Sequence, residues 1–144
     1  MLKIEVKNLD KIINNLNQKK SQLKPKSAEL TRDLTNIAHK WVQKEAPRRT
    51  GKLKAGVSKN IKDTSGHVFI SKSVSYADAV LEGTRPHQIT PKYKRALYWP
   101  GASHPVTSVQ HPGTKSNPFL DRAYNSMQSE IDSRLKLFVD WLTK

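Results

Sequence analysis

The chain has 144 residues, the size of one domain, and only 35% of them are hydrophobic, which predicts a thin core with much of the chain left to solvent or partners. Its 26 Lys and Arg residues outnumber its 12 Asp and Glu residues, so the net charge is +14 and favours polyanionic partners. No cysteine is present, which excludes disulfides and thiolate chemistry, and no apolar run reaches the length of about 18 residues that a membrane span needs. The first residues also lack the apolar core of a signal peptide, so we expect a protein that is used in the cytoplasm or leaves it inside a particle.

Two helices are predicted in the N-terminal part. Apolar residues recur at helical spacing over about Leu9 to Leu23, after a short extended piece from Lys3 to Val6. Pro25 is expected to end this helix, because proline lacks an N–H and its ring clashes with the preceding turn. A second, longer helix is expected to begin near Ser27 and to end at Pro47. Its apolar stripe consists of Leu30, Leu34, Ile37, Ala38, Trp41 and Val42.

A β-hairpin is predicted next. Apolar and polar residues alternate after the turn at Gly51, which is typical of a strand with one buried face. Asp63 to Gly66 indicates a turn, and His67 to Val74 the returning strand. The residues expected on the buried face of the first strand are Leu53, Ala55, Val57 and Ile61, and those expected on the basic outer face are Lys52, Lys54, Ser58 and Asn60.

A short helix from Tyr76 to Glu82 is predicted at the centre of the chain. Ser75 can cap its start, Asp78 complements the positive end of the helix dipole, and Gly83 can supply the left-handed residue that ends it. Helical spacing places Tyr76 and Val80 on one side, which suits packing against a sheet.

The remaining chain predicts a long irregular hairpin or loop over residues 88–116, followed by a C-terminal helix. Arg95 to Trp99 and Val106 to Gln110 are candidate short strands. Asn117 suits the helix cap and Pro118 the first helical position. One face of the helix carries Leu120, Tyr124, Met127, Ile131, Leu135, Phe138 and Leu142.

Together these elements predict an α+β fold in which a small antiparallel β-sheet packs against two N-terminal helices and a long C-terminal helix. We expect a single domain over residues 1–144, with the N-terminal helix of residues 1–25 and the segment 88–116 as its extensions.

The sequence gives no positive sign of an enzyme or of a cofactor. His87, His104 and His111 are spaced too irregularly for a metal site, and each lies beside a proline or in a turn. Neither a Gly-x-Ser-x-Gly motif nor a phosphate-binding glycine loop is present. Glu82 stands beside Gly83, where a carboxylate more often caps or pairs than acts as a base. We therefore expect binding rather than catalysis.

Several stretches resemble, in order, the tail-completion or head–tail joining proteins of tailed phages. The segment from Tyr76 to Thr84 is similar to the YA.YVE.GT segment of that family, and the HPGT of His111 to Thr114 is similar to a piece that longer members carry. The resemblance covers most of the chain from about Leu30 onward. Its other matches are AP followed by TG.L, at Ala46, Pro47, Thr50, Gly51 and Leu53, and NPFL..A, at Asn117, Pro118, Phe119, Leu120 and Ala123.

The resemblance implies a structural virion protein, assembled in the host cytoplasm, that forms a ring of identical subunits at the neck of a phage or prophage particle. Such a ring joins a tail-tube or tail-terminator protein to a stopper or adaptor protein on the head side, with double-stranded genomic DNA in its channel and no membrane contact. The start of the C-terminal helix, Asn117 to Leu120, belongs to the candidate site. The residues that we hypothesise at the subunit interface are Tyr76, Val80, Glu82, Gly83 and Thr84. The alternative is that Tyr76 and Val80 only pack the short helix on the sheet.

Positive charge is concentrated between Lys40 and Lys62, where eight Lys and Arg residues accompany only Glu45. Such a surface attracts DNA phosphates without reading sequence. It either lines the DNA channel or faces a partner protein, and the simplest alternative is an ordinary solvated surface. The residues assigned to it are Arg48, Arg49, Lys52, Lys54 and Lys59.

A nonspecific nucleic-acid-binding protein of a mobile element is the second class of function. Tyr93, Tyr98 and Trp99 lie close to Lys92, Lys94 and Arg95 in the sequence, but no recognised reader motif is present.

Overall fold

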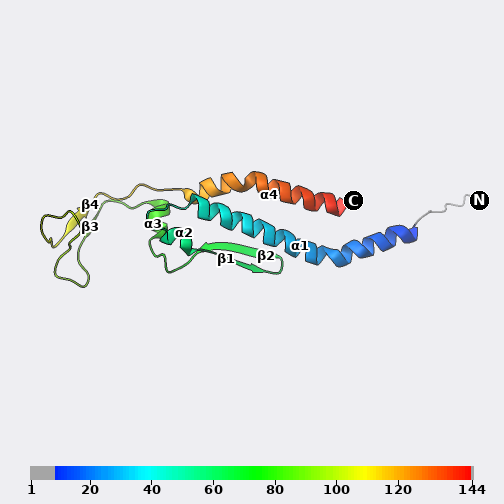
Figure 1. Ribbon diagram of the computed structural model, residues 1–144, viewed down its shortest axis with the longest axis horizontal. Coiled ribbons are helices and arrows are strands. Elements are labelled where there is room, and N and C mark those ends of the chain that lie inside the picture. The colour runs from blue at the N-terminus through cyan, green and yellow to red at the C-terminus, as the bar shows by residue number, and fades with distance from the viewer. Residues whose placement is uncertain (1–8, 144) are drawn as a thin grey trace, which may run out of the picture.

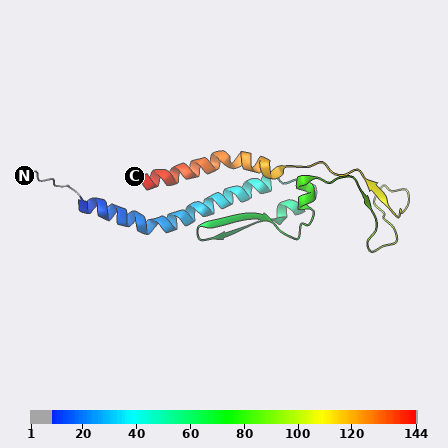
Figure 2. The same ribbon diagram turned by 180° about the vertical axis from the view of Figure 1, so that it is seen from behind.

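The computed structural model describes residues 9–143 and has an α+β fold. A long helix, α1, forms its axis, with α4 along one side and the hairpin β1–β2 along another (Figure 1). The view from behind shows the same three layers, and the β3–β4 pair beyond the end of the helices (Figure 2). The elements are α1 Leu9–Glu45, α2 Lys52–Gly56, β1 Val57–Lys62, β2 Ser65–Ile70, α3 Ala77–Glu82, β3 His87–Ile89, β4 Val109–His111 and α4 Phe119–Thr143.

The N-terminal part is one helix, so the prediction of two helices separated at Pro25 is wrong. α1 runs for 37 residues with Pro25 inside it. An internal proline forfeits one backbone hydrogen bond, costs about 3 kcal/mol and usually bends the helix. α1 is bent in its N-terminal half (Figure 1), and the Lys, Gln and Leu residues on both sides of the proline favour helix strongly enough to continue it. The extended piece expected at Lys3 to Val6 lies outside the described residues.

The predicted hairpin is present, but its first strand begins later than expected. Gly51 has φ 72°, and the Ala55 N–H donates to the Gly51 carbonyl at 2.9 Å, which closes the helical turn of α2 where a strand was expected. β1 and β2 pair antiparallel, with Val57 opposite Ile70 and Lys62 opposite Ser65. The turn is therefore only two residues long, and its Asp63 takes the left-handed φ of 50° that such turns need.

The short helix α3 is confirmed, but its predicted cap is wrong. Tyr76, not Ser75, occupies the N-cap position, and its side chain makes no capping hydrogen bond within the described part of the chain. The Tyr76 carbonyl instead accepts a hydrogen bond from the Val80 N–H at 3.1 Å. Gly83 ends α3 with φ 78° and ψ −177°, a combination that essentially only glycine adopts, so its expected role as the helix stop is confirmed.

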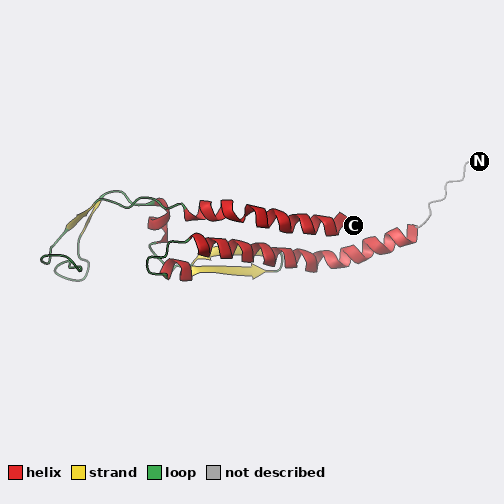
Figure 3. Cartoon of the chain, turned by 45° about the horizontal axis from the view of Figure 1, so that its top comes forward, coloured by secondary structure: helices red, strands yellow, loops and turns green. Residues whose placement is uncertain are grey.

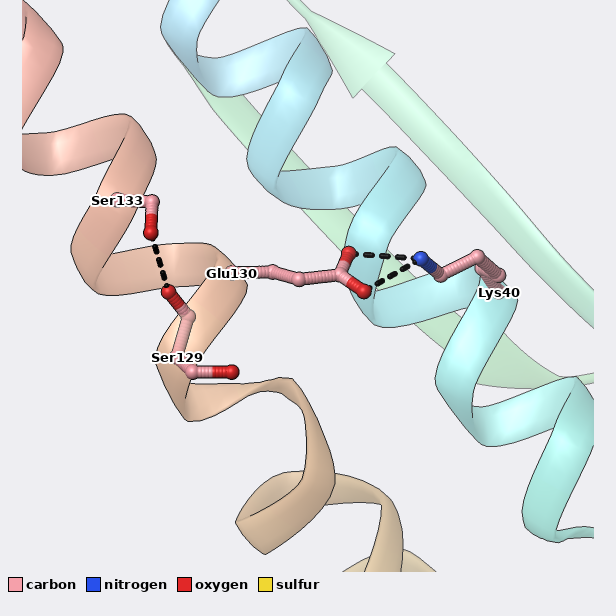
Figure 4. Close-up of polar contacts among 4 residues, drawn as sticks. All are labelled: Lys40, Ser129, Glu130 and Ser133. Atoms are coloured by element: carbon pink, nitrogen blue, oxygen red, sulfur yellow. Dashed lines mark hydrogen bonds and ion pairs between the residues drawn. The ribbon is translucent and has the colours of Figure 1, made fainter.

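Helix α4 runs antiparallel to α1 and is tied to it at intervals. Lys40 of α1 donates two hydrogen bonds of 2.7 Å to the carboxylate of Glu130, and near the other end Lys19 donates to the Leu142 carbonyl at 3.0 Å. Figure 4 shows the first contact bridging the two helices, beside the bond from Ser133 to the Ser129 carbonyl within α4. Of the apolar face expected on α4, Tyr124, Leu135 and Leu142 are exposed.

The hydrophobic core is small, as the composition predicts. Phe119 and Ala123 of α4 are fully buried, and they pack where the end of α1 meets α2 and α3. The complete set of buried apolar residues in the described chain is Val42, Ala46, Leu53, Val57, Val74, Ala77, Phe119 and Ala123.

Residues 83–116 form a thin projection that we call the arm. It is mostly loop and extends away from the helices (Figure 3). β3 and β4 pair antiparallel from His87 opposite His111 to Ile89 opposite Val109, and Leu97 forms an isolated bridge with Val106. An irregular hairpin is therefore confirmed, whereas strands over Arg95 to Trp99 and Val106 to Gln110 are mostly absent from it. The five prolines of the arm lack the N–H that a longer ladder requires.

Replacing Phe119 by Ala tests the core. Because the side chain is 0% exposed, we expect the free energy of unfolding to fall by about 3 to 5 kcal/mol, measured by urea unfolding followed by circular dichroism. Tyr124→Ala on the same helix is the control and should change stability by less than about 1 kcal/mol, since Tyr124 is 56% exposed. Equal losses in the two variants would contradict this core.

Candidate functional site

The segments that carry the family resemblance are far apart in the chain but meet at one place. Ala46 and Leu53 from the first segment are 2% and 3% exposed, Ala77 of the second is 7% exposed, and Phe119 and Ala123 of the third are completely buried. All five belong to the single apolar cluster. We call this meeting point the junction. The sequence predicts each segment separately, whereas their contact is visible only in the folded chain.

The two ends of the arm are fastened to each other beside the junction. The Thr84 N–H donates to the Thr114 carbonyl at 2.9 Å, and the Thr114 N–H donates back to the Thr84 carbonyl at 3.1 Å and to its hydroxyl at 3.0 Å. Gly83 and Gly113 both have positive φ. A Cβ on Gly83 would collide with the Thr114 carbonyl oxygen, and a Cβ on Gly113 with the Thr84 carbonyl oxygen, each on the opposite side of the arm. These contacts between residues 83–84 and 113–114 form a narrow connection that we call the neck. They fix the direction in which the arm leaves the junction.

The start of α4 is bound to the junction from two sides. The Asn117 N–H donates to the Val80 carbonyl at 3.0 Å, which joins α4 to α3. Arg122 donates from Nε to Glu45 of α1 at 3.3 Å and from Nη2 to the Asn117 side-chain oxygen at 2.7 Å. Helix α4 itself begins at Phe119, and the Pro118 carbonyl accepts from the Arg122 N–H at 3.2 Å. Asn117 thus fixes the approach to α4 through Arg122.

The residues predicted at a subunit interface divide into two groups. Tyr76 is 40% exposed and Glu82 is exposed, so both can reach another molecule. Val80 packs against the apolar cluster, and Gly83 and Thr84 belong to the neck. A substitution at Gly83 therefore tests the folding of the single chain rather than its assembly.

Part of the basic run forms one hollowed surface between α1 and α2. Its volume is about 370 Å³, and five of its six lining residues carry basic side chains: His39, Lys40, Gln43, Lys44, Arg48 and Lys54. His39 and Gln43 hold the wall together by bonding the carbonyls of Val57 and Lys54, at 3.1 and 3.4 Å. Arg49 and Lys52 are exposed nearby in the chain.

Some of these cations already have partners within the chain. The Lys44 ammonium lies 4.0 Å from the centroid of the Trp41 ring, and Lys40 binds Glu130. Lys59 donates to the Asn36 side-chain oxygen at 2.6 Å, on the side of β1 that faces α1. Lys59 therefore helps to seat the hairpin on α1, whereas Arg48, Arg49 and Lys52 remain exposed.

An open groove of about 740 Å³ separates α1 and α4 around the contact between Lys40 and Glu130. The hydrogen bonds from the Lys40 ammonium lower the pKa of Glu130 below its usual 4.5. The side chains that line the groove include Asn36, Ser129, Ser133 and Arg134. Ile37 and Leu137 also line it, so the open groove between the helices has both polar and apolar walls.

The histidines considered for a metal site lie in the arm and are engaged in local contacts. His87 and His111 stack with ring centroids 5.1 Å apart, and His104 contacts the Ser103 hydroxyl at 3.0 Å. Within residues 9–143 there is no group of three His, Cys, Asp or Glu side chains arranged to hold a metal ion. Over the same residues, no helix is both long and apolar enough to cross a membrane.

Comparisons of the chain with protein-family models, curated proteins and solved structures found no match.

The neck is tested by replacing Gly83 with Ala. The added Cβ meets Thr114 and lies 2.8 Å from the Ser116 nitrogen, so we expect faster hydrogen exchange at the Thr84 and Thr114 amides and a stability loss of about 1 to 3 kcal/mol. Gly101→Ala is the matched control, because Gly101 also has positive φ, at 96°, but its Cβ would enter open space. If the two variants exchanged alike at the neck, close packing there would be disproved.

The ion pair between Lys40 and Glu130 predicts a pH dependence. Because the pKa of Glu130 is lower in the folded chain, this pair stabilises the fold above the unfolded value of 4.5, and its contribution disappears as the pH falls through the lowered pKa. The difference in unfolding midpoint between the natural chain and Glu130→Gln should stay constant above pH 4.5 and narrow below it. In a Lys40→Gln background that narrowing should largely disappear, and its persistence there would point to another partner.

Proposed function

We propose that the chain is a structural protein of a tailed-phage or prophage particle. It forms a ring that joins head to tail in the neck region of that particle. The ring acts by binding: it contacts a tail-tube or tail-terminator protein on one side and a stopper or adaptor protein on the other. Genomic double-stranded DNA passes through it. It is assembled in the host cytoplasm and remains in the virion. The ordered resemblance over the junction segments supports this proposal.

The observation that carries the proposal is the exposure of large apolar side chains on both long helices toward the end of the molecule opposite the arm. Ile12 and Leu16 of α1 are 50% and 62% exposed, and Leu137 and Val139 of α4 are 60% and 52% exposed. Neighbouring subunits in a ring would cover these side chains, since apolar surface left to solvent is typical of contacts between proteins. The elongated shape, with a projecting arm, also suits a subunit whose neighbours cover much of it (Figure 1).

A closed ring of identical chains uses a head-to-tail interface, in which one patch meets a different patch on the next copy. Tyr76 and Glu82 support one such patch, because they are exposed at the two ends of α3, which packs against the junction and leads into the neck. Arg48, Arg49, Lys52 and Lys54 support the assignment of a channel wall. Many weak contacts with phosphate would keep DNA moving through the ring without binding any particular sequence.

The interface is tested by Glu82→Lys and Tyr76→Ala. We expect both variants to lose the ring, seen by gel filtration with light scattering, while the melting temperature of the single chain changes little. Asp132→Lys, a charge reversal on α4, is the control and should assemble normally. A loss of roughly 3 kcal/mol of stability in Tyr76→Ala would instead assign Tyr76 to internal packing. Normal rings from both variants would remove these residues from the interface.

The channel is tested by replacing Arg48, Arg49, Lys52 and Lys54 with Gln. If they contact duplex DNA, the plot of log affinity against log salt should flatten by about 0.9 for each phosphate that no longer pairs with a cation, and the ring should still form. If the variant instead gives filled heads without tails and its salt slope is unchanged, these residues face a partner protein.

The second class of function, nonspecific nucleic-acid binding by a mobile-element protein, is favoured by the basic hollow. A wall built mostly from cationic side chains binds phosphates whether or not a ring exists. Tight duplex binding by a chain that stays monomeric at all concentrations would favour this class over the ring.

A further inference from the structure

The arm has an unusual composition for a loop of its length. Residues 83–116 contain no Asp or Glu, whereas five Lys and Arg residues lie in them. Three of these cations, Lys92, Lys94 and Arg95, fall within four consecutive positions, and all three are exposed. The middle of the arm is therefore a concentrated positive charge without an acidic residue from its own segment.

Large aromatic side chains lie within and just after this cluster of charge and are open to solvent. Tyr93 is 98% exposed, Tyr98 is 68% exposed and Trp99 is 45% exposed. Aromatic rings are normally buried because they carry large apolar areas, so three exposed rings within seven residues need a ligand that covers flat apolar faces.

The backbone holds two of these rings in place although the arm has little core. Leu97 and Val106 exchange two backbone hydrogen bonds of 2.8 and 3.0 Å, and the Ala102 N–H donates to the Trp99 carbonyl at 3.0 Å. Tyr98 and Trp99 thus lie on a braced turn, while Tyr93 lies in the bend that leads to it. The arm stands away from the body of the molecule, which consists of the long helices and the β1–β2 hairpin (Figure 3). A long ligand can therefore reach these residues without a clash with the body.

We propose that residues 92–99 form a binding site for single-stranded nucleic acid. Lys92, Lys94 and Arg95 would neutralise backbone phosphates, and unpaired bases would stack on Tyr93, Tyr98 and Trp99. Duplex DNA satisfies the cations but hides the faces of its bases, and an acidic protein segment supplies charge without a row of flat rings. A single strand offers both at once. This site is separate from the proposed channel wall, which contacts duplex phosphates, and it does not require a ring.

The test uses the intact chain and a fluorescent oligothymidine of about 12 nucleotides, a length within the usual range for one site. Fluorescence anisotropy should show tighter binding to this strand than to a duplex of equal length. Tyr93→Leu and Tyr98→Leu remove a ring but no charge, so each should weaken single-strand binding about 5- to 150-fold with the salt slope unchanged. Lys92→Gln and Lys94→Gln should each lower that slope by about 0.7.

Tyr124→Leu, at an exposed tyrosine on α4, is the matched control and should bind as the natural chain does. Circular dichroism and gel filtration on the same variants separate this proposal from the ring, because the arm substitutions should leave helix content and assembly unchanged. Three results would overturn the proposal: equal or tighter binding to duplex, no effect of either tyrosine substitution, or competition by polyglutamate as strong as by unlabelled oligothymidine. The last result would identify an acidic protein partner.

Discussion

The packing of Phe119 and Ala123 into the junction is the contact on which the arrangement depends. A buried phenylalanine contributes roughly 1.5 to 3 kcal/mol by leaving water. The ion pairs along α1 and α4 are exposed to solvent, which screens them, so they align the helices without holding them together. Because α1, α2 and α3 all contribute residues to the same cluster, one apolar contact fixes the origin of α4, the seat of the hairpin and the base of the arm.

Concentrating the core at the junction has a consequence for the rest of the chain. The first turns of α1 and the last turns of α4 lie far from the cluster and keep their apolar residues in solvent (Figure 1). The arm likewise depends on the Thr84 and Thr114 bonds and on its short strands. Regions with few buried contacts open at low free energy. They are the parts that a neighbouring subunit or a ligand would order.

Charge follows the same division between body and arm. On the body, several lysines are bound by Glu130, Asn36 or Trp41, so only part of the basic run remains exposed. In the arm the cations stand beside exposed rings and far from acidic residues of their own segment. The two surfaces therefore suit different ligands, a smooth polyanion for the first and a strand with accessible bases for the second.

The sequence by itself determined the α+β class, the hairpin, the short helix that Gly83 ends and the C-terminal helix, because local periodicity and glycine conformation encode them. It misplaced the break at Pro25, since helix-favouring neighbours outweighed one missing hydrogen bond, and it took α2 for strand because an alternating pattern fits five residues of either kind. Only the tertiary structure decided which site residues share a function. Val80 and Gly83 serve packing within the chain, Lys59 binds Asn36, and His39 lines the basic hollow. The sequence could not predict these contacts, because contacts between residues distant in the chain leave no periodic pattern in it.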